Sequence, residues 1–137
     1  MGNFGCAAKR AVELVHDGIA ENPKIAWNMG LKEFTRSEST LTKSCPRGAF
    51  LGLCEEGIIV GIPAGKYTRS ITNKAYAVKA VEILRKSQQN ISQSELWKMV
   101  APHRTSPQDG QMDVVQSLWE QGFISNDLVV SREGDGF

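Results

Sequence analysis

Apolar residues recur three or four positions apart through most of the chain, which is the spacing of one face of an α-helix. The first such run covers residues 4–19. Asn22 followed by Pro23 matches a helix start, with an N-cap side chain before a proline in the first turn. This pair predicts a second helix that ends near Phe34, and the Ser- and Thr-rich residues 35–43 predict a loop.

The middle of the chain predicts a buried helix followed by a glycine-rich basic loop. Pro46 suits the first helical position, with Ser44 or Cys45 as the N-cap, and Gly57 suits the positive φ that closes a helix. Between these ends the residues are apolar on every side, and a helix that is apolar all round is a buried one. The apolar residues 58–62 and the basic loop, residues 61–70, come next.

The second half of the chain has a similar order of elements. Ser92 and Glu95 form a capping box, and Gly122 is placed to end the last helix. Helices are predicted over residues 73–87, from Ser92 to Pro102, and from Ser106-Pro107 to Gly122, followed by a hairpin with its turn at Asn126-Asp127.

Identical residues recur between the two halves at nearly constant spacing. Trp27 and Met29 return 70 positions later as Trp97 and Met99, and other identities return at offsets of 69 and 65. We therefore predict a mainly α fold of one domain, residues 1–137. It would hold two similar three-helix units, residues 4–65 and 73–131, around the central buried helix, with at most short β-hairpin pieces. Internal duplication and a helix-turn-helix or winged-helix-like unit follow as hypotheses.

Composition and charge narrow the classes of partner. The chain has 41 % hydrophobic and 23 % charged residues and a net charge of +1, so no strong overall field attracts a polyanion. Lys9, Arg10 and Glu13 interrupt any apolar secretory core near the start, and no apolar run is long enough to span a bilayer. We expect a cytoplasmic protein without membrane association, and a homodimer or another protein partner is open.

The clearest candidate for chemistry is an anion site. Residues 43–74 carry five basic and two acidic groups, and the start of a helix offers free N–H groups to an anion. We expect a small anionic ligand at the start of the Pro46 helix and the basic loop. The candidate binding residues are Cys45, Arg47, Gly48, Gly65, Lys66 and Arg69. The loop does not match a phosphate-binding P-loop, since its glycines are too close and Tyr67 stands where Ser or Thr is needed.

Two alternative functions, DNA binding and cysteine-dependent catalysis, belong to other functional classes. A winged-helix protein would place its third helix in DNA, but the predicted last helix has no Lys or Arg. Its polar residues are Gln108, Asp109, Gln111, Asp113, Gln116 and Glu120. Tight nucleic-acid binding is therefore not expected. Cys45 lies between Lys43 and Arg47, where a thiol pKa falls, but a cysteine enzyme would also need His16 or His103 as a base. No metal pattern and no cofactor motif are present, and we expect a non-enzymatic binding or regulatory module.

The motifs CPRGAFLGLCEEG, GIPAGKYTRS, NKxYAVKAVEIL and ELWKMV together resemble an uncharacterised family of small bacterial proteins, over roughly residues 4–120. The resemblance implies a bacterial, cytoplasmic protein. It implies no activity and assigns no functional residue.

Overall fold

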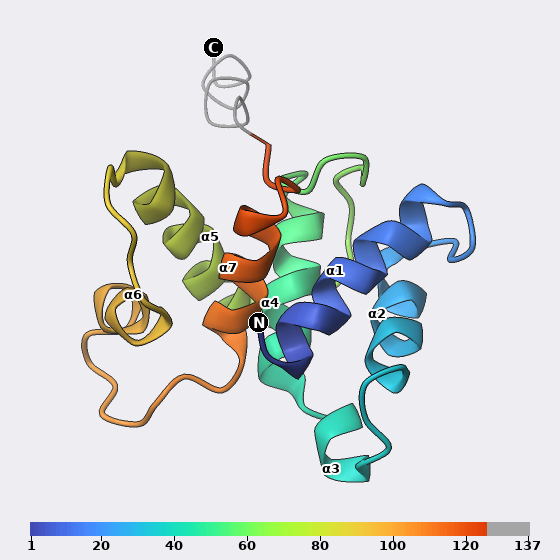
Figure 1. Ribbon diagram of the computed structural model, residues 1–137, viewed down its shortest axis with the longest axis horizontal. Coiled ribbons are helices and arrows are strands. Elements are labelled where there is room, and N and C mark those ends of the chain that lie inside the picture. The colour runs from blue at the N-terminus through green and yellow to red at the C-terminus, as the bar shows by residue number, and fades with distance from the viewer. Residues whose placement is uncertain (126–137) are drawn as a thin grey trace.

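The structure, a computed structural model, describes residues 1–125 and is mainly α-helical (Figure 1). The helices are α1 (Asn3–His16), α2 (Pro23–Lys32), α3 (Glu38–Leu41), α4 (Ser44–Glu55), α5 (Ile71–Lys86), α6 (Gln93–Val100) and α7 (Gln111–Glu120). The predicted fold class is confirmed, and the short α3 lies inside the segment predicted as a loop.

Helices α4 and α7 form the centre of the molecule. In Figure 1, α1 and α2 lie on one side of this pair and α5 and α6 on the other. Buried apolar residues from both halves of the chain form one continuous core. Eight of the twelve α4 residues are buried, which confirms the buried central helix.

Several helix ends follow the local sequence. The Asn22 side chain accepts a hydrogen bond from the Ile25 N–H at 3.0 Å, and the Ser92–Glu95 capping box is complete. Gly57 and Gly122 have φ of +74° and +76°, as expected for glycines that follow a helix. These ends were predictable because each depends only on residues a few positions apart.

Two predicted helix starts are wrong. Helix α4 begins at Ser44, so Pro46 is its third residue; proline is tolerated there because N–H groups in the first turn lack helical partners. Helix α7 begins at Gln111 and not at Ser106-Pro107. Its N-cap Gly110 has φ of +93°, a conformation that interrupts any helix entering from residue 107.

The two halves are packed together through equivalent helix pairs. A Cβ atom added to Gly5 on α1 would lie 2.0 Å from the Ser117 Oγ on α7. One added to Gly52 on α4 would lie 2.6 Å from the Lys74 Cβ on α5. Gly5 and Lys74 are 69 positions apart, and Gly52 and Ser117 are 65 positions apart. Identical residues recur between the two halves of the sequence at these same two offsets. Each half therefore places its first helix on the third helix of the other half.

The segments that follow α4 and α7 pair with each other. Ile59 and Ile124 form an isolated antiparallel bridge, and these two residues are themselves 65 positions apart. The Val60 N–H donates to the Phe123 carbonyl at 2.9 Å, and the Ser125 N–H donates to the Ile58 carbonyl at 2.8 Å. In the described part of the chain Ile124 thus pairs with the first half. The predicted turn at 126–127 lies outside the described residues.

The two paired tryptophans have different surroundings. Trp27 is fully buried and stacks on Phe50 of α4, with ring centroids 5.4 Å apart. Trp97 meets Tyr76 of α5 edge-on at 5.0 Å, and its Nε1–H donates to the Ser106 carbonyl. Internal duplication is therefore not confirmed, although the equivalent helix pairs and the central bridge are consistent with it.

Candidate functional site

Three of the predicted binding residues line one surface pocket. Arg47 comes from the first turns of α4, and Lys66 and Arg69 come from the basic loop. Lys24, at the start of α2, supplies a fourth cation. These four residues with Tyr67 and Thr68 line a hollow of ≈ 520 Å³, which we call the basic pocket.

The positive charge of the basic pocket is not compensated by its own lining. None of the six lining residues is acidic, and none of the four cations forms an ion pair with a carboxylate within residues 1–125. Other basic side chains of the protein do have such partners, namely Arg10, Lys43 and Lys74. Converging cations without counter-ions raise the local positive potential and attract anions.

The basic loop is held in place by Glu55, the last residue of α4. One carboxylate oxygen accepts hydrogen bonds from the backbone N–H groups of Tyr67 at 2.8 Å and Thr68 at 3.1 Å. The other oxygen accepts from the Lys74 ammonium at 2.7 Å. The Lys74 bond and these two backbone donors lower the pKa of Glu55 from 4.5 to about 2. Glu55 therefore stays ionised at neutral pH and keeps the loop closed onto α4.

The Glu55 contacts decide which hydrogen-bond donors of the basic loop are already used. A P-loop presents backbone N–H groups to phosphate, but here the N–H groups of Tyr67 and Thr68 already bind the carboxylate. The cationic donors of the basic pocket are therefore side chains, those of Lys66 and Arg69 on either side of the bound segment and those of Lys24 and Arg47 from the helices.

The predicted glycines shape the loop and its packing without lining the pocket. A Cβ atom on Gly65 would lie 2.9 Å from the Tyr67 ring, whose hydroxyl donates to the Pro63 carbonyl at 2.8 Å. A Cβ atom on Gly48 would lie 2.9 Å from the Ser70 Cβ at the start of α5. Both positions need the absence of a side chain so that the loop can pass closely.

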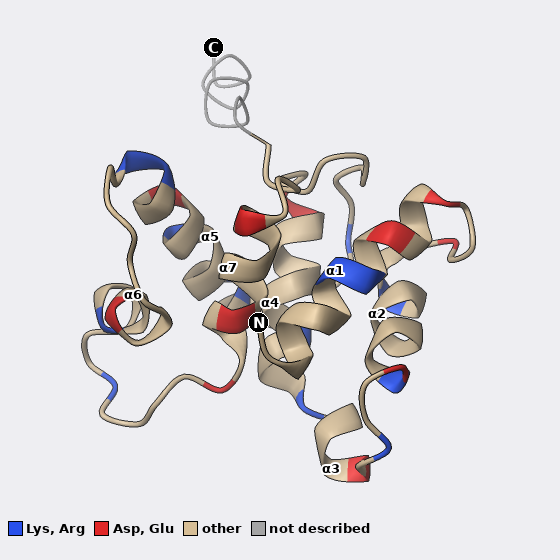
Figure 2. Cartoon of the chain, in the orientation of Figure 1, with Lys and Arg blue, Asp and Glu red and all other residues tan. Residues whose placement is uncertain are grey.

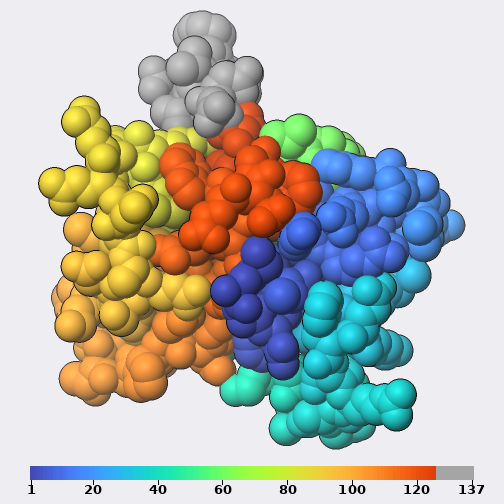
Figure 3. Space-filling model, in the orientation of Figure 1, coloured from blue at the N-terminus to red at the C-terminus, as the bar shows by residue number. Residues whose placement is uncertain are grey.

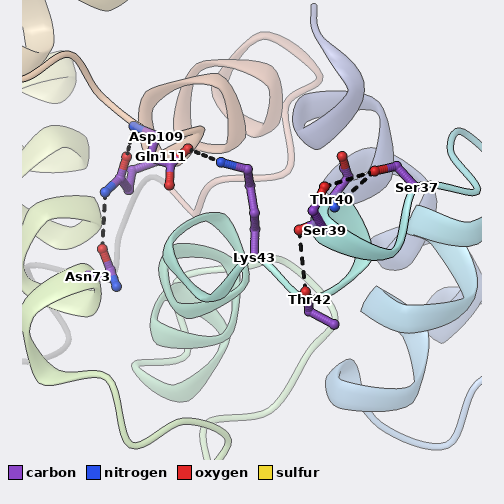
Figure 4. Close-up of polar contacts among 8 residues, drawn as sticks. All are labelled: Ser37, Ser39, Thr40, Thr42, Lys43, Asn73, Asp109 and Gln111. Carbon is purple, nitrogen blue, oxygen red and sulfur yellow. Dashed lines mark hydrogen bonds and ion pairs between the residues drawn. The ribbon is translucent and has the colours of Figure 1, made fainter.

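Cys45, in the first turn of α4, lines a different hollow, which we call the polar groove. Cys45 shares it with Tyr76, Trp97 and Arg104 among others, and its volume is ≈ 430 Å³. Figure 4 shows the hydrogen bonds along this side of the molecule. The Lys43 ammonium donates to Asp109, the Asp109 N–H donates to Gln111, and the Gln111 amide donates to Asn73. In the first turns of α4, Cys45 therefore lines the polar groove, whereas Arg47 lines the basic pocket.

The two histidines are placed differently relative to Cys45. The His16 Nε2 lies 2.7 Å from the Val60 carbonyl, and its ring packs edge-on against Phe123. Cys45 lies in the first turn of α4, whereas Val60 follows the far end of that helix, so His16 is separated from the thiol by the length of α4. His103 is not among the residues that line the polar groove. His16 therefore lies away from Cys45, and His103 does not line the groove that Cys45 shares.

Neither third helix is presented as a DNA-reading surface. Seven of the ten α7 residues are buried, and Figure 2 shows acidic but no basic positions along this helix. Figure 3 shows α7 wedged between the N-terminal helix and the α5–α6 side of the molecule. A recognition helix must enter a groove of the duplex, and α4 and α7 are both occupied by packing within the protein.

Lys24 is a lining residue of the basic pocket that the sequence did not indicate. It follows Pro23 in a segment where its neighbours predict only a helix start, and it is 42 positions from Lys66. The position becomes informative only when α2 is known to lie beside α4.

Within residues 1–125, no helix is long and apolar enough to cross a bilayer, and no three His, Cys, Asp or Glu side chains are grouped for a metal ion.

The sequence model of a family of unknown function, DUF6979, matches residues 1–125 of this chain, which confirms the resemblance to an uncharacterised family. No curated protein and no solved structure gives a significant match.

Proposed function

We propose that this chain, which belongs to the family of unknown function DUF6979, is a binding module for a phosphate-bearing small molecule. The ligand would occupy the basic pocket, and its anionic oxygens would meet Lys24, Arg47, Lys66 and Arg69. The observation that carries this proposal is the convergence of four cations from α2, α4 and the basic loop without an acidic partner.

The residue types favour phosphate over a single carboxylate. Arginine presents a planar fork of donors that binds phosphate oxygens in pairs, and lysine adds a compact charge. Thr68, which lies between the two loop cations in the sequence, also lines the basic pocket. Phosphate offers more acceptor oxygens and more charge than a carboxylate, so it uses more of these donors at once.

The lining favours binding over catalysis. General acid–base chemistry most often uses His, Asp or Glu within hydrogen-bond reach of the reacting atoms, and less often Lys or Tyr. The six lining residues include no His, Asp or Glu, and their titratable side chains are Lys24, Lys66 and Tyr67 besides the two arginines. The nearest carboxylate on α4, Glu55, is occupied by two backbone N–H groups and Lys74.

A thermal-shift screen of phosphorylated and carboxylated metabolites tests the proposal. A ligand should raise the melting temperature of the wild type, because binding to the folded state alone stabilises it. The Lys66→Ala/Arg69→Ala variant should lose affinity by about 2–4 kcal/mol, as charged hydrogen bonds contribute roughly 1.5–3 kcal/mol each and are not fully additive. Its stability without ligand should change little, because both side chains are exposed.

A matched control removes one lysine and one arginine elsewhere. Lys98 and Arg36 are exposed and lie outside the basic pocket, so Lys98→Ala/Arg36→Ala makes the same change in net charge. The control should bind like the wild type. Equal loss of ligand stabilisation in both double variants would show a general charge effect and contradict a site in the basic pocket, as would a screen in which no anion stabilises the wild type.

A further inference from the structure

The charge and size of the basic pocket exceed what one phosphate group can use. A phosphomonoester carries about two negative charges near neutral pH, whereas the pocket carries four cations and no lining carboxylate. Its volume of ≈ 520 Å³ lies within the range of small-molecule sites, roughly 300–1,000 Å³, and a water molecule occupies only about 30 Å³ of liquid. A single phosphate would leave both space and charge unfilled.

The four cations come from two parts of the fold. Lys24 and Arg47 extend from the starts of two packed helices, α2 and α4. Lys66 and Arg69 extend from the loop on either side of the segment that Glu55 holds. Each pair has enough charge for one phosphate group. The helix pair and the loop pair face one shared hollow, so a ligand that satisfies both must have two anionic groups.

We infer that the ligand of the basic pocket carries two phosphate groups, as a diphosphate or a bisphosphate. One group binds the helix pair, Lys24 and Arg47, and the other binds the loop pair, Lys66 and Arg69. This inference rests on the proposed function and specifies its class of ligand. The half-buried Tyr67 ring lies beside the loop pair and offers an apolar wall to the organic part of such a ligand.

Calorimetric titration of the full-length protein with inorganic phosphate, pyrophosphate and methylenediphosphonate tests the inference at constant ionic strength. Pyrophosphate and methylenediphosphonate should bind at least about 30-fold more tightly than phosphate, since a second set of charged hydrogen bonds is added. Lys24→Ala/Arg47→Ala and Lys66→Ala/Arg69→Ala should each reduce the affinity for pyrophosphate to near that of phosphate. Citrate, a trianion without phosphate, should bind no more tightly than phosphate.

The possible results separate this inference from the proposed function. If phosphate and pyrophosphate bind within threefold of each other and Lys66→Ala/Arg69→Ala weakens both, the pocket takes one phosphate group and only the inference is overturned. If only one of the two double variants affects pyrophosphate, the bipartite site is wrong. If neither phosphate compound binds, or Lys98→Ala/Arg36→Ala weakens binding equally, both the inference and the proposed function are contradicted.

Discussion

The carboxylate of Asp113 on α7 accepts a hydrogen bond from the backbone N–H of Gly5 on α1 at 2.7 Å. The same side chain accepts from the Gly2 N–H at 2.9 Å. The N-cap residue of α1 is itself Gly2, which has no side chain to bind these free N–H groups. A residue from the far half of the chain therefore caps the first helix, and its negative charge also suits the positive end of the helix dipole.

Replacing Asp113 should destabilise the protein much more than replacing another aspartate nearby. Asp113→Ala leaves the N–H groups of the N-cap Gly2 and of Gly5 without this acceptor, and Asp113 is only 6 % exposed, so we expect a loss of about 2–4 kcal/mol in the free energy of unfolding. Asp109→Ala is the control, because its pair with Lys43 is partly exposed and should contribute about 0–1 kcal/mol. Urea unfolding measures both, and equal losses would show that Asp113 does not cap α1.

Glu55 should make stability depend on pH in the acid range. Its folded pKa is about 2 against an ordinary 4.5, so its stabilising contribution is complete above about pH 5.5 and is lost as the pH falls toward 2. Glu55→Gln should cost about 1–2 kcal/mol at neutral pH. The difference in unfolding free energy between wild type and variant should narrow below pH 4.5 and vanish near the folded pKa. A difference that is constant over this range would contradict the assigned pKa.

Gly52 should not tolerate even one methyl group. Alanine is favoured over glycine in a helix by about 1 kcal/mol. Here, however, the new Cβ would lie 2.7 Å from the Lys74 Cα, a backbone atom that cannot rotate away. We expect Gly52→Ala to destabilise the protein by about 1–3 kcal/mol through overpacking. Thermal unfolding checks the sign, and a stabilised variant would show that α4 and α5 are farther apart than described.

The three cysteines should differ in reactivity toward a thiol reagent. Cys54 is fully buried, and burial raises the pKa of its thiol, so little reactive thiolate forms. Cys6 and Cys45 are partly exposed. Titration with a chromogenic disulfide should modify two thiols in the native protein and the third only after unfolding. Cys54→Ala identifies that third thiol, and rapid modification of three thiols in the native state would contradict the packing of α4.

The local patterns of the sequence were enough to predict most helices, but not the contacts between them. The Asn22 cap and the Ser92–Glu95 box depend on neighbours three positions apart, so they could be read directly. Asp113 is one of several polar residues in its helix, and these residues together suggested an exposed face. It is buried because the N–H groups that it binds come from 108 or more positions earlier in the chain.

In the candidate site, too, residues close together in the sequence could be predicted, whereas residues brought together by packing could not. The cations of the basic loop and Arg47 lie within one short stretch of the sequence, and three of these cations, Arg47, Lys66 and Arg69, line one pocket. Cys45 was grouped with them because it was placed at the start of the Pro46 helix beside Arg47, but side chains two positions apart on a helix point to different sides. Cys45 therefore faces the polar groove. Lys24 joins the pocket through the packing of α2, which no local pattern describes.

The exchange of helices between the two halves has a consequence for how the chain can be divided. Because α1 packs on α7 and α5 packs on α4, a break within the basic loop would give two fragments whose longest helices, α1 and α5, each lose one packing partner. The apolar surface at these two contacts would be exposed in the separate fragments, and the Ile59–Ile124 bridge would also be divided between them. Association of the two fragments would restore these contacts, so the stability of a severed chain would depend on its concentration.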